Sequence, residues 1–185
     1  LLLPEDYGII ALVVIFTSIA SVFVQSGLNS ALIQKKDADE VDFSSVFYLS
    51  LFIAVLIYII LFLAAPFIAA FYKIPEITPV FRVLSITLFF GAFNSIQNAV
   101  VARNLEFKKL FFSSTGAILI SGTVGIYMAY TGFGVWALVG QQISNQLFVT
   151  LILWFTVKWR PQLLFSLERV KALFSFGWKL LASSM

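Results

Sequence analysis

Amide side chains form the densest cluster of chemically capable residues in an otherwise apolar sequence. The segment "VGQQISNQLF" carries Gln141, Gln142, Asn145 and Gln146 between two hydrophobic stretches. In an α-helix, which turns by about 100° per residue, these four side chains fall within one arc of roughly 140°. Because hydrocarbon cannot satisfy such groups, the arc must face protein or water.

Two other sets of amides lie in apolar segments. One contains Asn94, Gln97 and Asn98, and the other contains Gln25 and Asn29. An amide both donates and accepts hydrogen bonds, which suits the hydroxyl groups of a glycan. Two interpretations stay open for all these amides: they line a hydrated substrate path, or they hold helices together through hydrogen bonds.

Two arginines flank the segment that carries Asn94, and both are candidate contacts for a diphosphate. Arg82 lies at its beginning and Arg103 at its end. A guanidinium group can form two parallel hydrogen bonds with phosphate oxygens. The alternative for each arginine is a snorkelling side chain that only sets membrane topology.

The composition argues against catalysis. The chain contains no His and no Cys, so the usual general base, the commonest metal ligand and thiol chemistry are missing. The carboxylates lie near the ends of apolar segments or between them, so we place no ion-coupling site in mid-membrane. We therefore expect no enzyme, no metal site and no cofactor.

Composition and segment length predict a membrane protein of the all-α class. The chain is 61% hydrophobic and 11% charged, whereas a soluble domain carries about 25% charged residues. A helix needs about 20 residues to cross a bilayer. We expect a polytopic transmembrane helix bundle with five spans and the start of a sixth, at about 7–25, 46–71, 80–101, 110–130, 135–157 and from 176.

Basic residues orient these spans. Ten of the twelve Lys and Arg residues follow the first, third and fifth spans, and only Lys73 and Arg82 lie on the other side. The positive-inside rule makes the first group cytoplasmic, so the N-terminus of this chain is expected outside and the segment after residue 158 inside. Because the basic residues lie in short segments between spans, we expect the lipid bilayer, and no nucleic acid, as a partner.

The last part of the sequence changes character. Ser166 is a candidate N-cap, and in the helix expected after it apolar residues lie on one face and charged residues beside them on the other. This pattern predicts an amphipathic helix on the cytoplasmic surface. We therefore divide the chain into transmembrane helices of one lobe (1–158), a linker helix (159–175) and the start of the first helix of a second lobe (176–185).

Six segments in order resemble bacterial polysaccharide-transport flippases of the multidrug/oligosaccharidyl-lipid/polysaccharide exporter superfamily. They are "LLPEDYGIIALVVIF", "GLNSALIQKKD", "APFIAAFYKIPEITPVFRVLSI", "VVARNLEFKKL", "GFGVWALVGQQ" and "WRPQLLFSLERVKALFSFGWKLLASS". The resemblance implies a two-lobed transporter of about 12–14 helices that alternates access. Its implied activity moves a polyprenyl-diphosphate-linked oligosaccharide from the cytoplasmic to the outer leaflet of the bacterial inner membrane.

The resemblance leaves other functions open. A multidrug exporter of the same superfamily should carry an intramembrane carboxylate and a more aromatic cavity. A non-transporting scaffold of a glycan-synthesis complex would use the amides for packing alone. A membrane-embedded glycan polymerase or acyltransferase should show a large polar loop, and the sequence has none. Glycan polymerases and glycosyltransferases are instead expected as partners.

Overall fold

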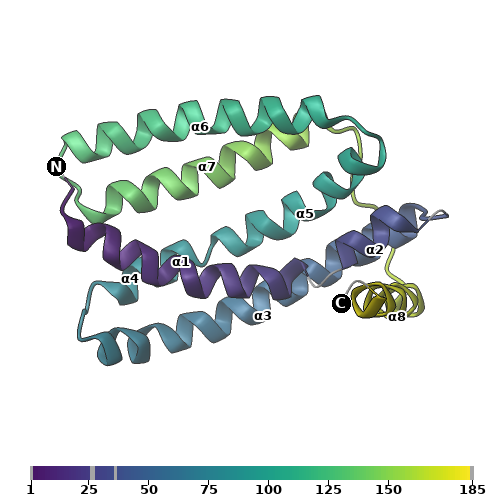
Figure 1. Ribbon diagram of the computed structural model, residues 1–185, viewed down its shortest axis with the longest axis horizontal. Coiled ribbons are helices and arrows are strands. Elements are labelled where there is room, and N and C mark those ends of the chain that lie inside the picture. Colours follow the sequence, from purple (N-terminus) through teal and green to yellow (C-terminus); the bar gives the residue numbers. More distant parts are fainter. Residues whose placement is uncertain (1, 26–27, 36, 184–185) are drawn as a thin grey trace.

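The computed structural model describes residues 2–25, 28–35 and 37–183, and every regular element in these ranges is an α-helix (Figure 1). Apolar helices keep all their backbone hydrogen bonds internal, which is what a bilayer requires. The helices are α1 (Pro4–Gln25), α2 (Leu28–Gln34), α3 (Glu40–Tyr72), α4 (Ile77–Leu84), α5 (Thr87–Arg103), α6 (Phe107–Tyr130), α7 (Val135–Thr156) and α8 (Leu167–Ser183).

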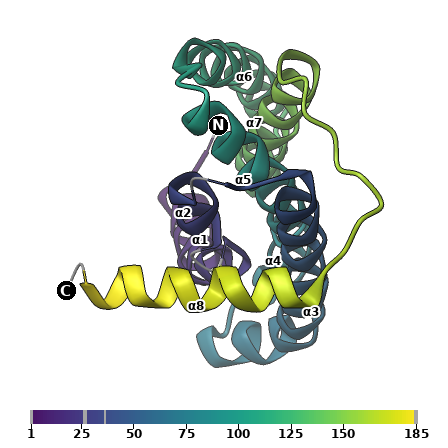
Figure 2. The ribbon, with the colours of Figure 1, turned by 90° about the vertical axis from the view of Figure 1, so that its right-hand side faces the viewer.

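The long helices run side by side, and α8 crosses one end of the bundle. Figure 2 looks along the bundle and shows α6 and α7 as one pair, α1 and α3 on the opposite side, and α5 between them. Helix α8 contacts α2 and α3 at the end where it crosses. The amphipathic helix predicted from Ser166 onward is therefore present, and it continues without a break to Ser183. The division into two lobes stays a prediction.

Length and composition support four candidate membrane spans among the described residues, one fewer than predicted from the sequence. They are Pro4–Val24, Glu40–Tyr72, Ile77–Arg103 and Phe107–Tyr130. Helix α7 has 22 residues, but its four amides lower its mean hydropathy. Large apolar side chains such as Phe67 and Phe112 are exposed on the outer faces of the bundle, as expected of surfaces solvated by lipid.

The third span is interrupted between α4 and α5. The Ser85 hydroxyl donates to the Phe81 carbonyl at 2.7 Å, and the Thr87 hydroxyl donates to the Leu84 carbonyl at 2.6 Å. Short hydroxyl side chains compete with the helical ladder in this way and distort it. Within a membrane, such an interruption is tolerated where the backbone is buried in protein or lines a polar cavity.

Helices α6 and α7 form an antiparallel hairpin, as the segment "YTGFGVW" predicted. Gly132 (φ 84°) and Gly134 (φ 54°) adopt left-handed conformations in the turn, which glycine reaches without the steric penalty of a side chain. Because the turn is short, α7 runs back directly beside α6, and residues of the two helices pack on each other.

Arg82 has a structural partner on α3. Pro66 has no N–H and therefore leaves the carbonyl of Phe62, four residues earlier, without its helical donor. The Arg82 Nε donates to this carbonyl at 3.3 Å, and the guanidinium lies 4.1 Å from the centre of the Phe62 ring. Arg82 thus compensates for the proline.

The link between Arg82 and Pro66 can be tested by a double-mutant cycle. Arg82→Leu should lower the free energy of unfolding by roughly 1 kcal/mol, because it leaves the Phe62 carbonyl unpaired. The same substitution should cost clearly less in a Pro66→Ala background, where the backbone N–H restored at position 66 can satisfy that carbonyl. Thermal unfolding of the four proteins in detergent measures the coupling, and equal costs in both backgrounds would contradict it.

Candidate functional site

The arc of amides on α7 faces two different surroundings. Its first side packs on α6: Asn145 Nδ2 donates to Ser121 Oγ at 3.2 Å. A Cβ added to Gly125 would lie 3.0 Å from the Cβ of Gln141, so the two helices approach closely here. Asn145 therefore bonds α7 to α6 in the way that one of the two interpretations of the sequence predicted, and the stem of Gln141 packs on α6 while its side chain stays exposed.

The other side of the arc lines a polar cavity of about 320 Å³ between α1, α5 and α7. Gln142 and Gln146 contribute from α7, and Asn94 and Asn98 contribute from α5. Thr17, Ser18 and Ser21 of α1, together with Thr87 and Ser95 of α5, complete its polar lining. None of the described residues that line this cavity is charged.

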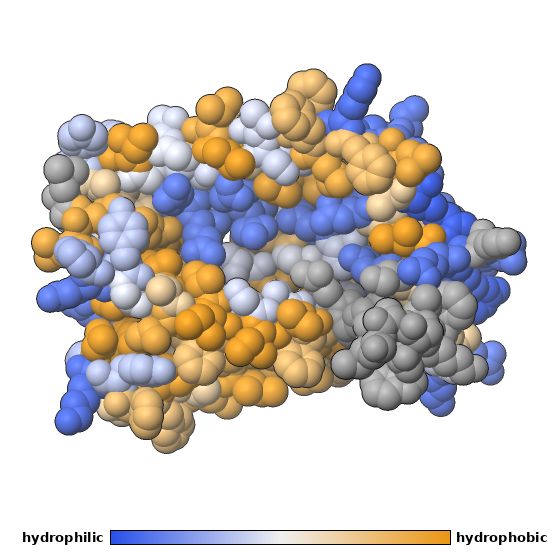
Figure 3. All heavy atoms as spheres, in the orientation of Figure 1, coloured by the Kyte–Doolittle hydropathy of each residue, from blue (hydrophilic) through white to orange (hydrophobic). Residues whose placement is uncertain are grey.

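A second cavity of about 330 Å³ adjoins the first on the α6 side. It is lined by Gln141, Gln142, Asn145 and Gln146, together with Ser121, Ile10 and Leu138. Gln142 and Gln146 belong to both cavities. Figure 3 shows hydrophilic residues gathered in a hollow between α7 and α1, with hydrophobic surface above and below it. A polar, uncharged hollow thus lies between two apolar surfaces.

The amides of α5 differ in their access to this hollow. Asn94 is only 6% exposed and its Oδ1 has no hydrogen-bond partner among the described residues, whereas Asn98 is exposed. Gln97 is 2% exposed, and neither of its amide atoms has a hydrogen-bond partner in the described part. It lines neither cavity. Asn94 and Asn98 therefore join the α7 amides, whereas Gln97 points elsewhere.

Asn29, another of the predicted amides, lines neither cavity. Asn29 is half-buried on α2, and its Oδ1 has no hydrogen-bond partner in the described part of the chain. Gln25 ends α1, but its side chain lies outside the described residues. Their assignment to a substrate path stays a prediction.

The sequence analysis missed the hydroxyl residues of α1. Thr17, Ser18 and Ser21 follow a spacing of one, three and four residues, which puts Thr17 and Ser21 on one helical face. That spacing was a readable signal. It is inconspicuous because Ser and Thr can satisfy their own protons on helix carbonyls, as Thr17 does on Val13 at 3.1 Å.

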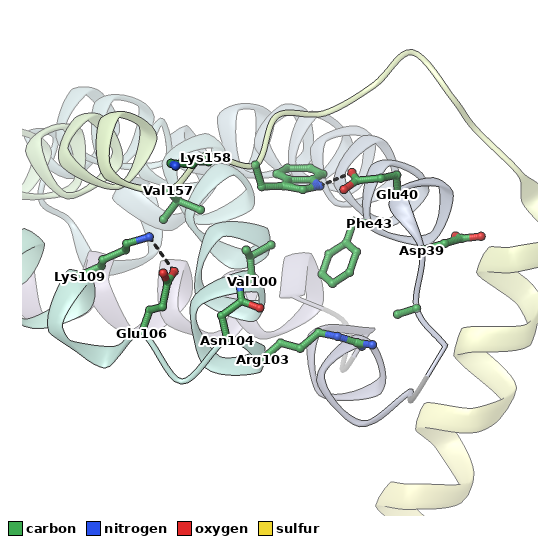
Figure 4. Close-up of a pocket in the computed structure, with 12 residues that line it drawn as sticks. Asp39, Glu40, Phe43, Val100, Arg103, Asn104, Glu106, Lys109, Val157 and Lys158 are labelled. Carbon is green, nitrogen blue, oxygen red and sulfur yellow. Dashed lines mark hydrogen bonds and ion pairs between the residues drawn. The ribbon is translucent and has the colours of Figure 1, made fainter.

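Arg103 lies at the end of the bundle where α8 crosses, and it lines a third cavity of about 700 Å³ (Figure 4). Its Nη1 donates to the carbonyl of Leu32 in the last turn of α2 at 3.1 Å and to that of Lys35 just after α2 at 2.6 Å. In the same cavity Lys109 pairs with Glu106 at 2.6 Å. Lys158 also lines it and has no ion pair within the described residues.

Charged residues at the start of α3 bind α8 to the bundle. Asp42 is fully buried and accepts from Lys35 Nζ at 2.5 Å. Arg169 of α8 lies 3.3 Å from Asp39 and 3.6 Å from Asp42. We call these four residues the α8 clamp. They fix the orientation of α8 because the two partners of Arg169, Asp39 and Asp42, both lie at the start of α3.

The same two aspartates cap α3. Asp42 N donates to Asp39 Oδ1 at 3.0 Å, and Asp39 N donates to Asp42 Oδ2 at 3.2 Å, which is a reciprocal capping box. The hydrogen bond from the Asp42 backbone lowers the pKa of Asp39 below its ordinary value of 3.8, and Arg169 and Lys35 lower it further. The ionised Asp39 carboxylate therefore stabilises the fold at pH values above its ordinary pKa of 3.8, and this stabilisation is lost as the pH falls through its lowered pKa.

The segment between α7 and α8 is held by hydrogen bonds to the same helix. Gln162 N donates to Ser44 Oγ and Ser166 N donates to Ser45 Oγ, both at 3.0 Å. Trp159 Nε1 donates to Glu40 at 2.7 Å. Ser166 in turn accepts from Arg169 N at 3.4 Å and caps α8, as predicted.

A family model described as "Polysaccharide biosynthesis protein" matches residues 1–185, the whole chain. The chain belongs to this family. The resemblance to polysaccharide-transport proteins read from the sequence is therefore confirmed, and the chain is part of a multi-pass membrane protein of that kind. No solved structure matches it.

Three curated relatives are similar over nearly all of this chain. The succinoglycan biosynthesis transport protein ExoT of Rhizobium meliloti (strain 1021) is 27% identical over 179 residues, which are 96% of this chain and 36% of the relative. The teichuronic acid biosynthesis protein TuaB of Bacillus subtilis (strain 168) is 29% identical over 170 residues, 87% of this chain and 34% of the relative.

The third relative is the lipopolysaccharide biosynthesis protein WzxC of Escherichia coli (strain K12). It is 23% identical over 183 residues, 98% of this chain and 37% of the relative. The chain thus spans about a third of the length of the relatives that it matches.

The close packing of Gln141 on α6 predicts different effects for two glycines. Gly125→Ala should be less stable than Gly122→Ala by roughly 1–2 kcal/mol, because only the first new methyl group meets Gln141. Gly122 has no atom within 4 Å of an added Cβ, so it is the matched control on the same helix. Thermal unfolding in detergent measures both, and equal stability would contradict the packing.

The α8 clamp predicts that Arg169→Gln releases the segment that joins α7 to α8. Proteolysis of residues 158–166 should become several-fold faster, because Asp39 and Asp42 lose their partner on α8. Glu168→Gln is the control, since Glu168 forms no ion pair with any described residue. Equal cleavage rates in Arg169→Gln and the unmodified protein would rule the clamp out.

Proposed function

We propose that the protein carrying this chain flips a polyprenyl-diphosphate-linked oligosaccharide from the cytoplasmic to the outer leaflet by alternating access. The observation that carries the proposal is the uncharged polar hollow between α1, α5 and α7, enclosed by apolar surface. A sugar headgroup needs a polar route across the membrane, and such polar groups inside a bilayer are otherwise costly.

The residues of the hollow suit a glycan that must be released again. Asn94, Gln142 and Gln146 can each accept and donate hydrogen bonds to hydroxyl groups. Neutral contacts of this kind are individually weak, about 1 kcal/mol each. Several weak contacts therefore guide the glycan without trapping it, which a transporter requires.

The membrane arrangement follows from this function. Helix α7 crosses the bilayer as a fifth span, because its amides face the hollow and not the lipid. The protein lies in the bacterial cytoplasmic membrane with the first residues of this chain outside and the segment after residue 158 inside. It is a two-lobed transporter of about 12–14 helices, of which this chain supplies one lobe, and it works beside glycan polymerases and glycosyltransferases.

The diphosphate is recruited at the cytoplasmic end. Arg103 and Lys158 line the cavity of about 700 Å³ there (Figure 4). Arg103 also holds the end of α2 through two carbonyls, so its guanidinium is already oriented. Arg82 remains a candidate for the outer end, where it would exchange the Phe62 carbonyl for a phosphate oxygen.

The alternatives receive less support from the cavities. A multidrug exporter is expected to carry a carboxylate in its cavity, and none lines the two cavities of the hollow. A scaffold needs its amides only for packing. The bond from Asn145 to Ser121 meets that description, but Gln141, Gln142 and Gln146 face open volume.

The proposal predicts the outcome of complementation. The full-length protein should restore surface polysaccharide in a bacterium that lacks its own flippase for the same glycan. A Gln142→Leu/Gln146→Leu variant should reach the membrane in normal amount and lower export roughly tenfold or more, because it removes at least two hydrogen-bonding groups from the path. Surface polysaccharide is quantified per cell and per amount of membrane protein.

Gln162→Leu is the matched control, since Gln162 is an exposed amide between α7 and α8 and lines neither cavity of the hollow. It should export at the unmodified rate. Failure of the unmodified full-length protein to restore polysaccharide, despite correct insertion, would refute the flippase assignment.

A further inference from the structure

The two cavities of the hollow share a boundary. Gln142 and Gln146 line both of them, and each cavity has a volume slightly above 300 Å³. This is the lower end of the range for small-molecule pockets. Each is therefore a compartment for a small unit, and the two glutamines form the division between neighbouring units.

We propose that these compartments are two adjoining subsites, each for one uncharged sugar unit of a glycan, with Gln142 and Gln146 contacting both units. The inference rests on the proposed function, since it concerns the glycan that is moved through the hollow. It adds the number of units bound at one time, their lack of charge and the residues that contact each unit.

The first subsite, between α1, α5 and α7, presents oxygen atoms that accept hydrogen bonds. The hydroxyl protons of Thr17, Ser21 and Thr87 are already donated to the backbone carbonyls of Val13, Ser18 and Leu84. Their lone pairs remain available to a ligand. Asn94 adds a nearly buried Oδ1 without a partner among the described residues.

This pattern selects for hydroxyl groups and against carboxylates. A sugar hydroxyl can donate its proton to any of these acceptors, whereas a carboxylate can pair only with the amide N–H groups of the lining and leaves the other acceptors without a donor. An anion would also leave water without a cationic partner, because no Lys or Arg lines the subsite. The unit bound here is therefore an uncharged sugar and not a uronic acid.

The second subsite, on the α6 side, has a different balance. Ser121 Oγ donates to the Ile118 carbonyl and accepts from Asn145. The Ser121 hydroxyl and the Asn145 amide therefore have fewer hydrogen bonds left to offer a ligand. Gln141, Gln142 and Gln146 supply amide groups that both donate and accept. This subsite therefore accepts a second sugar in more than one orientation and discriminates less than the first.

The test measures sugar binding to the purified full-length protein in lipid nanodiscs by saturation-transfer difference NMR. The ligands are glucose, glucuronic acid, maltose and maltotriose. Maltose should bind at least about fivefold more tightly than glucose, because it reaches a second set of hydrogen bonds. Maltotriose should bind no more tightly than maltose, and glucuronic acid should bind more weakly than glucose.

Substitutions distinguish the two subsites. Asn94→Ala should weaken glucose and maltose binding roughly fivefold or more, and Gln146→Leu should remove the advantage of maltose over glucose. Asn104→Ala, the same replacement at the end of α5, should change neither. Equal binding of glucose and maltose, equal binding of glucuronic acid and glucose, or an equal loss in Asn104→Ala would overturn the proposal.

A second readout does not depend on the stability of these variants. This chain has no Cys, so Ser18→Cys introduces a single thiol into it, at the lining of the first subsite. A water-soluble maleimide should label this thiol, and maltose should slow the labelling more than glucose does. An unreactive thiol would mean that another part of the protein fills the hollow, and it would overturn the proposal. Sodium chloride is the control ligand, and it would also overturn the proposal if it slowed the labelling as much as maltose does.

The two levels of the proposal fail separately. If complementation succeeds while maltose shows no advantage over glucose, the flippase assignment stands and the paired subsites are refuted. If the sugars bind as expected while the full-length protein exports no glycan, the transport function is refuted and the sugar site stands.

Discussion

Hydrocarbon offers no partner to a polar group, and this constraint governs the whole arrangement. Each amide, hydroxyl or interrupted backbone segment within the bundle must meet protein, or else water or a ligand in a cavity. Asn145 is satisfied by Ser121, and the Phe62 carbonyl is satisfied by Arg82. Of the amides that remain, Asn94, Asn98, Gln142 and Gln146 line the cavities, whereas Gln97 and Asn29 lie apart from them.

The same constraint connects the fold to the proposed transport function. The interruption between α4 and α5 brings Thr87 to the polar hollow, and the apolar faces of α3 and α6 keep the surrounding surface compatible with lipid. At the end where α8 crosses, aqueous surroundings permit charges, and the α8 clamp and Arg103 use them. The bundle therefore separates a neutral path in its middle from charged contacts at its end.

Much of this could be predicted from the sequence, because it depends on local patterns. The helical class, the α6–α7 turn, the Ser166 cap and the amide arc follow from hydropathy, glycine positions and helical periodicity.

Contacts between distant segments could not be predicted in this way. The arc on α7 divides between α6 and the hollow only because α6 approaches at Gly125, and one sequence carries no record of that approach. The clamp joins Asp39 to Arg169 across most of the chain. Mean hydropathy leaves α7 out of the candidate spans, because its four amides lower that value.

The most direct measurement is flipping by the purified full-length protein in liposomes that contain a polyprenyl-diphosphate-linked oligosaccharide. Asn94→Leu is the informative variant, because Asn94 Oδ1 has no partner in the described structure and its loss should leave packing intact. If the hollow is the glycan path, Asn94→Leu keeps its unfolding temperature and flips the lipid roughly tenfold more slowly. An unchanged flipping rate at unchanged stability would contradict a glycan path through this hollow.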